Sequence, residues 1–174
     1  MTTDRMFNVL FLCTHNSTRS VLAECVMNRL DKGRFKGYSA GSMPSGRVHP
    51  MALDLLKSLN YDISGLRSKS WDEFATSGAP EMDFIFTVCD NAAREVCPIW
   101  PGHPASAYWG LPDPSTTQGN EAEKRLAFAE THRMLSQRIG AFINLPFSSL
   151  DRLSLKKRLD EIGEMEGNTS PAKV

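Results

Sequence analysis

Residues 7–20 read FNVLFLCTHNSTRS, and this stretch decides the fold. Its first six residues form an apolar run of strand length, typical of a central strand in a parallel sheet. A polar segment follows, and beyond it apolar residues recur at the helical spacing i, i+3, i+4, i+8. These residues are Leu22, Cys25, Val26 and Leu30. The stretch therefore predicts a buried strand, a tight loop and an amphipathic helix in succession.

The same two patterns alternate along the rest of the chain. Further strands are expected at 36–40, 83–88 and 105–109, and further helices from His49-Pro50 onward and at 71–75, 121–144 and 150–165. The apolar face expected for the helix at 121–144 comprises Leu126, Ala129, Leu135, Ile139, Phe142 and Ile143. Strands that alternate with helices predict an α/β fold with a parallel sheet.

Three chemically active residues follow predicted strands. Cys13 follows the first strand, Cys89 follows the strand at 83–88, and Asp113 comes shortly after the strand at 105–109. Ligands of open parallel sheets bind beyond the carboxyl ends of the strands. We therefore expect all three residues at one edge of the sheet.

Composition limits the class of protein. Of the 174 residues, 41% are hydrophobic, and 20 basic side chains balance 20 acidic ones. This balance provides no broad basic field for a nucleic acid or an anionic membrane, and no apolar run approaches the roughly 18 residues of a transmembrane helix. We expect a cytoplasmic protein with a domain over 1–147, a charged helix over 148–165 and a mobile tail over 166–174. Its four cysteines are then reduced thiols, and Cys25, on a helix face, is expected in the core.

The loop from Cys13 to Ser20 has a cysteine, five residues and an arginine between a strand and a helix. Backbone N–H groups converge at such a helix N-terminus, where the helix dipole also attracts an oxyanion and lowers the pKa of a thiol. Arg19 can add a bidentate contact, Ser20 can donate to a Cys13 thiolate, and Asn16 tolerates a left-handed backbone. The alternative is a chance cysteine and arginine around a polar turn. The predicted oxyanion-binding residues are Thr14, His15, Asn16, Ser17, Thr18, Arg19 and Ser20.

Four motifs in this order give the chain a family resemblance: LFLCTHNSTRS, YSAGS, FTVCDNAAREVCP and YWGLPDPS. Over about residues 7–145 the chain resembles the low-molecular-weight protein tyrosine phosphatase superfamily, and more closely its arsenate reductase branch. The resemblance implies a four-stranded parallel sheet flanked by helices, in flavodoxin-like order. It also implies that Cys13 is the nucleophile, Arg19 binds the oxyanion and Asp113 is the general acid.

Two features favour the reductase branch. The phosphatases commonly have aromatic residues after the Asp-Pro pair and after the second strand, whereas here neither Ser115 nor the loop 42–48 supplies a ring. The second feature is the pair Cys89 and Cys97, since reduction of arsenate needs two electrons from thiols and phosphatase chemistry does not. The resemblance implies a Cys13–Cys89 disulfide that Cys97 takes over as Cys89–Cys97 and presents to an external reductant.

Two departures from the family pattern bear on partners and cofactors. Seven residues separate Cys89 from Cys97, where thioredoxin-coupled members typically have six, so glutaredoxin with glutathione is an alternative reductant to thioredoxin. Lys69 stands where potassium-binding members carry an acid, although Asn16, Glu24 and Ser39 match the rest of that site. An ammonium could replace the cation, and we predict no required metal or other cofactor.

Other interpretations stay open at this point. The chain could instead be a low-molecular-weight phosphatase that hydrolyses phosphomonoesters or phosphotyrosine, or a non-catalytic oxyanion sensor. Cys89 and Cys97 could be structural thiols. A zinc site is disfavoured, because no two of the four cysteines have the close spacing of zinc ligands.

Overall fold

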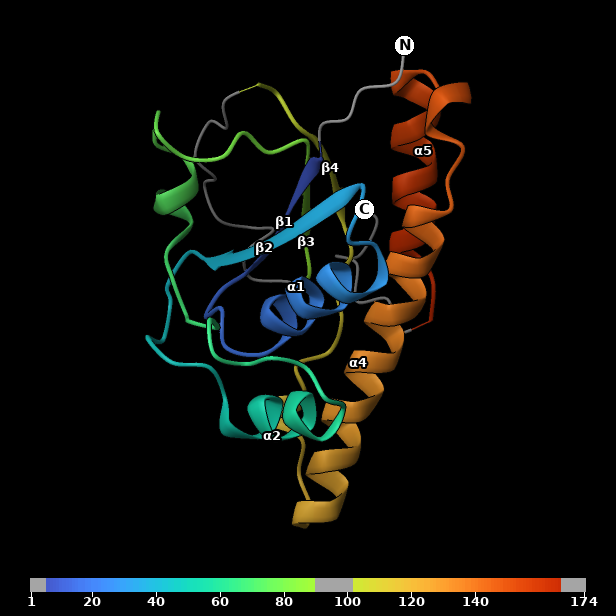
Figure 1. Ribbon diagram of the computed structural model, residues 1–174. Coiled ribbons are helices and arrows are strands. Elements are labelled where there is room, and N and C mark those ends of the chain that lie inside the picture. Colours follow the sequence, from blue (N-terminus) through green and yellow to red (C-terminus); the bar gives the residue numbers. More distant parts are fainter. Residues whose placement is uncertain (1–5, 90–101, 167–174) are drawn as a thin grey trace, which may run out of the picture.

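Residues 6–89 and 102–166 are described by the computed structural model of the chain (Figure 1). The strands are β1 (Phe7–Cys13), β2 (Phe35–Gly41), β3 (Phe84–Thr87) and β4 (Ala105–Tyr108). The helices are α1 (Arg19–Leu30), α2 (Pro50–Ser58), α4 (Glu121–Ile143) and α5 (Arg152–Gly163). Short 3-10 helices lie at Trp71–Phe74, Pro114–Thr116 and Phe147–Ser149. The predicted elements are present, with ends that differ by one or two residues, and the short helix expected at 71–75 is a 3-10 helix.

The four strands form one sheet in the order β2-β1-β3-β4, and every neighbouring pair is parallel. The predicted α/β fold with a four-stranded parallel sheet in flavodoxin-like order is therefore confirmed. The register places Cys13 opposite Gly41, and Leu12 opposite Thr87. Since all strands run the same way, their carboxyl ends lie at one edge, and the loops that carry the candidate residues leave from that edge.

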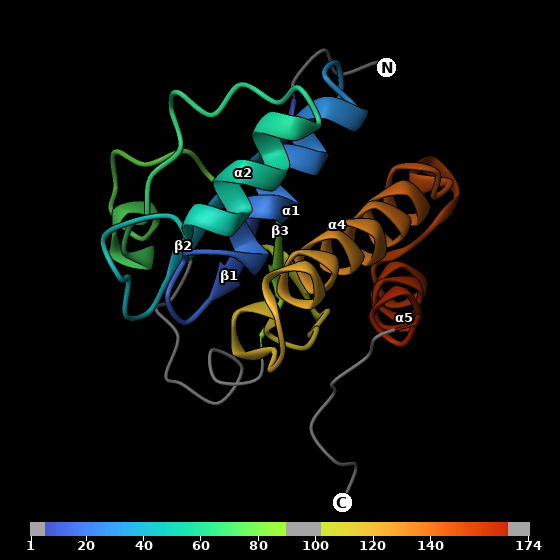
Figure 2. The same ribbon diagram turned by 90° about the horizontal axis from the view of Figure 1, so that it is seen from below.

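Alternate side chains of β1 point to opposite faces of the sheet, as the two-residue period of a strand requires. Val9 and Phe11 pack with α1, α4 and α5 in the larger core. Leu10 and Leu12 pack on the other face against the 3-10 helix at 71–74. Figure 2 shows α1, α2 and α4 gathered on the first of these faces. Because both faces are covered, β1 is apolar on both, which explains its run of apolar residues.

The C-terminal helix α5 packs against the edge strand β4. Nε1 of Trp109 donates to the carbonyl of Leu159 at 2.9 Å, and Nζ of Lys156 donates to the carbonyl of Ser106 at 2.7 Å. Arg138 of α4 is fully buried and donates to the carbonyls of Met165 at 3.2 Å and Glu166 at 3.1 Å. A cationic side chain thus binds the carbonyl end of α5, where the helix dipole is negative.

Two apolar residues do not lie where the helical spacing predicts. Leu126 is 61% exposed and Leu30 is 45% exposed, so their assignment to buried faces is wrong. The first turns of α4 extend beyond the sheet (Figure 1), and Leu30 is the last residue of α1. Helix spacing identifies a face, but the neighbouring element must be long enough to cover it.

The division of the chain at residue 147 stays a prediction, and the tail from residue 167 lies outside the described residues. Within the described ranges, none of the helices combines the length and the apolar character that a bilayer crossing requires.

Candidate active site

The loop between β1 and α1 leaves the start of the helix open to a ligand. Thr18 is the N-cap residue of α1 but makes no side-chain capping hydrogen bond, and the first turn of the helix has no acidic residue. The Thr18 hydroxyl is buried, with no hydrogen-bond partner in the part of the chain that the structure describes. Helix N-termini left in this state present unpaired N–H groups and the positive end of the helix dipole. The site can therefore attract an anion.

Cys13, the last residue of β1, has its sulfur against this loop. The backbone N–H of Asn16 donates to Cys13 Sγ at 3.3 Å, and Ser20 Oγ lies 3.1 Å from the same sulfur. Nδ2 of Asn16 donates to Ser20 Oγ at 2.8 Å, which leaves the Ser20 hydroxyl hydrogen free to point at Cys13. Asn16 has φ 47°, the left-handed conformation expected from the sequence.

The environment of Cys13 favours the thiolate. A hydrogen bond from Cys89 has the largest effect, and together with Ser20 and the positive charge of Arg19 it lowers the pKa of Cys13 to about 5 against the opposing effect of burial. The second thiol of the site is thus part of what activates the first. A thiolate of this kind is a nucleophile at neutral pH.

Cys89 comes from the end of β3 and lies against the same loop. Its sulfur accepts the backbone N–H of Thr14 at 3.1 Å and lies 3.5 Å from the Thr14 hydroxyl oxygen. Cys13 and Cys89 are both buried, and both are in the reduced form. The structure therefore brings the two cysteines together as the sheet topology predicts, while Cys97 lies outside the described residues.

Arg19 and Asp113 face each other across the mouth of the loop. Nη1 of Arg19 donates to the carbonyl of Leu111 at 2.8 Å, and its Nη2 lies 3.5 Å from Oδ2 of Asp113. The other carboxylate oxygen of Asp113 accepts the backbone N–H of Ser115 at 3.0 Å and the Ser115 hydroxyl at 2.7 Å. One oxygen of Asp113 is thus fixed by the chain, and the other is turned toward the loop.

The space between these residues is small. A cavity of about 10 Å³ lies at the loop. Its lining residues are Cys13, His15, Ser17, Thr18, Arg19 and Asp113. A cavity of this volume holds about one water molecule. A tetrahedral oxyanion is larger than a water molecule, so an oxyanion bound at the loop must extend beyond this cavity.

The rim carries no aromatic wall in the described residues. His15 is exposed and its Nδ1 lies 3.2 Å from the carbonyl oxygen of Met43, whose own side chain is 65% exposed. Trp109, the aromatic residue nearest to the Asp113 loop in sequence, is fully buried and stacked on Phe86 with ring centroids 3.7 Å apart. Trp109 therefore belongs to the core and does not line the site.

Cys25 differs from the two cysteines of the site. It is buried on α1, and burial, together with the negative charge of Glu24, raises its pKa to about 12. The prediction of a core thiol is confirmed, and Cys25 is not a nucleophile at neutral pH. Within residues 6–89 and 102–166, no three or more His, Cys, Asp or Glu residues are grouped as metal ligands.

Sequence reasoning did not assign a role to Ser115 or to the Leu111 carbonyl, although both fix the charged pair at the mouth. A signal for Ser115 was present, because Asp followed by Pro is a common start of a short helix, with the Asp side chain as its cap. A hydrogen bond to a backbone carbonyl leaves no such signal in the sequence.

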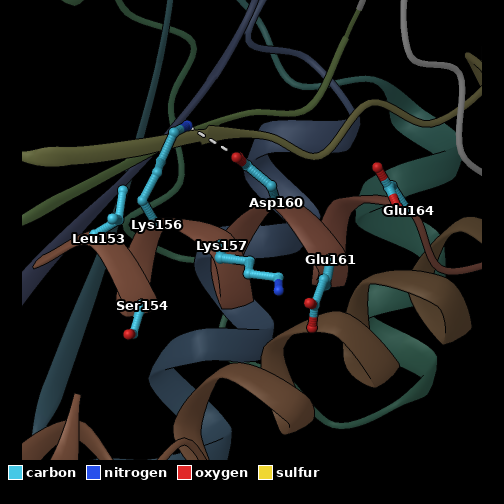
Figure 3. Close-up of a pocket in the computed structure, with 7 residues that line it drawn as sticks. All are labelled: Leu153, Ser154, Lys156, Lys157, Asp160, Glu161 and Glu164. Atoms are coloured by element: carbon cyan, nitrogen blue, oxygen red, sulfur yellow. Dashed lines mark hydrogen bonds and ion pairs between the residues drawn. The ribbon is translucent and has the colours of Figure 1, made fainter. Parts of the chain in front are cut away.

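Another hollow, of about 610 Å³, lies along α5 (Figure 3). Charged residues line most of it, and Lys156 pairs with Asp160 at 2.9 Å. None of the predicted site residues is among its lining residues, which come from α5 and Glu164 directly after it. The chemistry is therefore expected at the β1–α1 loop.

Comparisons with known proteins show which family the chain is similar to. Residues 8–158 match the family model of low molecular weight phosphotyrosine protein phosphatase. The chain is 33% identical to an arsenate reductase of Oceanobacillus iheyensis over 134 residues, which cover 77% of this chain and 93% of the relative.

Two solved structures are also similar. An arsenate reductase from Archaeoglobus fulgidus has TM-score 0.57 and 28% identity, over 76% of this chain and 98% of that one. A low molecular weight protein tyrosine phosphatase from T. tengcongensis has TM-score 0.63 and 25% identity, over 79% of this chain and 97% of that one. The fold is thus common to reductases and phosphatases, and the site must distinguish between them.

Proposed function

This chain belongs to the low molecular weight phosphotyrosine protein phosphatase family, and from that membership we propose that it reduces arsenate to arsenite. The observation that carries the proposal is the second thiol. Cys89 lies against the nucleophile loop with its sulfur hydrogen-bonded to Thr14, and phosphate-ester hydrolysis has no use for a thiol at that position. Reduction of pentavalent arsenic needs two electrons, and two thiols supply them when they become a disulfide.

In the first step the Cys13 thiolate attacks arsenic in an arsenate bound at the start of α1. A sulfur–arsenic bond forms and an arsenic–oxygen bond breaks. Asp113, in its protonated form, gives a proton to the leaving oxygen, which departs as water. Arg19 and the loop N–H groups hold the remaining oxygens, whose charge they stabilise.

In the second step the Cys89 thiolate attacks the sulfur of Cys13. A disulfide forms, the sulfur–arsenic bond breaks, and its electron pair stays on arsenic, which leaves as arsenite. Arsenic gains two electrons, and the two thiols lose them. The hydrogen bond from the backbone N–H of Thr14 to the Cys89 sulfur supports this role, because a donor near a thiol favours its thiolate form.

The lining of the site favours arsenate over an aryl phosphate. Among the described residues that line the cavity there is no Phe, Tyr or Trp, so they offer an aromatic ester little apolar contact, whereas an inorganic oxyanion needs only the loop and Arg19. Phosphatase activity remains the alternative outcome of the test below.

Arsenite release is measured with the wild-type chain, with Cys89→Ser and with Cys25→Ala as a matched control for loss of a buried thiol. We expect the wild type and Cys25→Ala to release arsenite over many turnovers. Cys89→Ser should not sustain repeated turnover. Acid quenching of reduced protein after addition of arsenate, followed by disulfide mapping, should show a Cys13–Cys89 bond in the wild type. Full activity of Cys89→Ser with glutathione and glutaredoxin would assign the second electron pair to an external thiol.

Asp113 is tested separately. Asp113→Asn should slow arsenate turnover by about 10²-fold or more, because general acid catalysis contributes a factor of that order. Bound phosphate should protect Cys13 from alkylation, which reports oxyanion binding, and this protection should be nearly the same in Asp113→Asn as in the wild type. Hydrolysis of p-nitrophenyl phosphate at a rate above arsenate reduction would favour the phosphatase alternative.

The proposal also concerns the external reductant that restores the two thiols. The internal disulfide must be reduced by a protein thiol, either thioredoxin or glutaredoxin with glutathione, which are available in the reducing conditions of a cytoplasm. If Cys97 exports the disulfide, Cys97→Ser should stop turnover with thioredoxin. Turnover of Cys97→Ser with thioredoxin at the wild-type rate would remove Cys97 from the relay.

A further inference from the structure

A partly buried ion pair lies behind the nucleophile loop. The side chain of Lys69 is only 9% exposed, and its Nζ lies 3.8 Å from Oε1 of Glu24, whose side chain is 19% exposed. The same carboxylate oxygen accepts the Ser39 hydroxyl at 2.6 Å. Burial lowers the pKa of Lys69, and the charge of Glu24 opposes this effect. Glu24 of α1, Ser39 of β2 and Lys69, which precedes the 3-10 helix at 71–74, therefore come together at this ion pair.

The backbone of Lys69 is bonded to the loop itself. Its N–H donates to Oδ1 of Asn16 at 2.9 Å. Asn16 is fully buried in a left-handed conformation, and its Nδ2 donates to Ser20 Oγ, which lies 3.1 Å from Cys13 Sγ. A continuous series of contacts therefore runs from the segment that carries the ammonium to the nucleophilic sulfur.

Neighbours of Lys69 make further bonds to the same region. The carbonyl of Lys69 accepts the N–H of Gly41 at 2.9 Å, and Gly41 also forms a parallel bridge with Ser70. The hydroxyl of Ser68 donates to the carbonyl of His15 at 2.9 Å. Residues 68–70 thus support the loop from behind, and the loop geometry depends on where this segment lies.

We propose that Lys69 is a positioning residue, whose ammonium neutralises Glu24 and holds residues 68–70 where Asn16 orients the Cys13 sulfur. Removal of one member of a buried pair leaves the other charge uncompensated, which is far more costly than removal of both. Without the ammonium, the Glu24 carboxylate draws in water or rotates outward, and the segment that donates to Asn16 moves with it. The effect reaches Cys13 although Lys69 touches neither the substrate nor the sulfur.

The structure also offers a route for chemical rescue. Glu24 lines an open pocket of about 530 Å³ between α1 and residues 60–66. A small ammonium ion in solution can therefore reach the carboxylate when the lysine side chain is truncated. Rescue by such an ion separates the role of the positive charge from that of the aliphatic part of the side chain.

The proposal rests on the proposed function only for its turnover readout, so its main readout is the reactivity of Cys13 without arsenate. Alkylation of Cys13 by iodoacetamide is followed against pH for wild type, Lys69→Met, Lys69→Arg and the exposed control Lys57→Met. In Lys69→Met the pH midpoint should rise by roughly one unit, because hydrogen bonds to the charged sulfur are lost, and kcat for arsenate should fall about tenfold with little change in KM. For Lys69→Arg and Lys57→Met, the alkylation midpoint and kcat should stay near the wild-type values.

Two further measurements decide the cause. Methylammonium added to Lys69→Met, and the double variant Lys69→Met with Glu24→Gln, should each lower the alkylation midpoint again, since each removes the uncompensated charge. A midpoint for Lys69→Met equal to that of Lys57→Met, with only a lower melting temperature, would overturn the proposal. If the midpoint shifts as expected while wild type reduces no arsenate, the positioning role stands and the proposed function fails.

Discussion

Gly41 at the end of β2 lies so close to the nucleophile loop that no side chain fits there. A Cβ built on Gly41 would lie 2.5 Å from the carbonyl oxygen of Thr14, 3.0 Å from the backbone nitrogen of Asn16 and 3.0 Å from the carbonyl oxygen of Cys13. All three neighbours are backbone atoms of the loop, which cannot rotate away as a side chain can. In Gly41→Ala the loop must therefore move by about half an ångström before the shortest contact reaches even 3.0 Å.

The size of the effect follows from this displacement. Overpacking of a filled site costs about 1–3 kcal/mol of unfolding free energy, and a misplacement of about 1 Å can cost 10²-fold in rate. We therefore expect Gly41→Ala to lose about 2 kcal/mol in urea denaturation and about tenfold in arsenate turnover. Gly33→Ala is the matched control, because nothing lies within 4 Å of a Cβ at Gly33. If the two alanine variants are equally stable and equally active, the close approach of Gly41 to the loop does not fix its geometry.

Three further predictions follow from the structure. The folded-state pKa of Cys13 is lowered to about 5, so its alkylation rate should be nearly independent of pH between 7 and 9 and fall only below pH 6. Cys25 should stay unmodified throughout. An alkylation rate of Cys13 that climbs steadily through pH 8.5 would contradict this. Arg138→Met should cost about 2 kcal/mol, as charged hydrogen bonds are lost, and should speed hydrogen exchange in α5 more than in α1; equal protection of α5 would argue against its attachment through Arg138. Asn120 caps α4 in a capping box with Glu123. Asn120→Ala should therefore lower the unfolding free energy by about 1 kcal/mol in thermal or urea denaturation. An unchanged unfolding free energy would show that the cap is dispensable.

The succession of strands and helices along the chain and the location of the site could be predicted because they follow from local patterns and one topological rule, whereas the order of the strands in the sheet is implied by the family resemblance. The apolar run of β1, the polar loop and the helical spacing of α1 each occupy a short window of sequence. Parallel strands end at one edge, so Cys13, Cys89 and Asp113 had to lie near one another once the sheet was inferred. The left-handed conformation of Asn16 could also be expected from its residue type.

Contacts between distant parts of the chain leave no comparable pattern. Arg138 lies at the helical spacing of the apolar face of α4, three residues after Leu135, but an arginine is ordinarily exposed. It is fully buried because it donates to carbonyls that follow α5. Leu126 fits the apolar stripe of α4 and is nevertheless exposed, since the helix continues past the sheet at that end. The burial of Arg138 depends on a segment more than 20 residues away, and the exposure of Leu126 depends on the absence of a covering element. A single sequence does not show where such elements lie.

Two cysteines close together in the sequence show how the local environment of a thiol determines its reactivity. Cys13 and Cys25 are both buried, and burial alone raises the pKa of any thiol. Cys13 precedes the first turn of α1, where a hydrogen bond from Cys89, a hydrogen bond from Ser20 and the charge of Arg19 lower its pKa to about 5. Cys25 lies two turns further on, where the N–H groups are already bonded within the helix and the adjacent charge of Glu24 is negative, and its pKa rises to about 12. Of these two thiols, only Cys13 is in an environment that favours the thiolate. In the role that we propose for Lys69, its ammonium neutralises the same Glu24 that raises the pKa of Cys25, so that this charge leaves the Cys13 loop undisturbed.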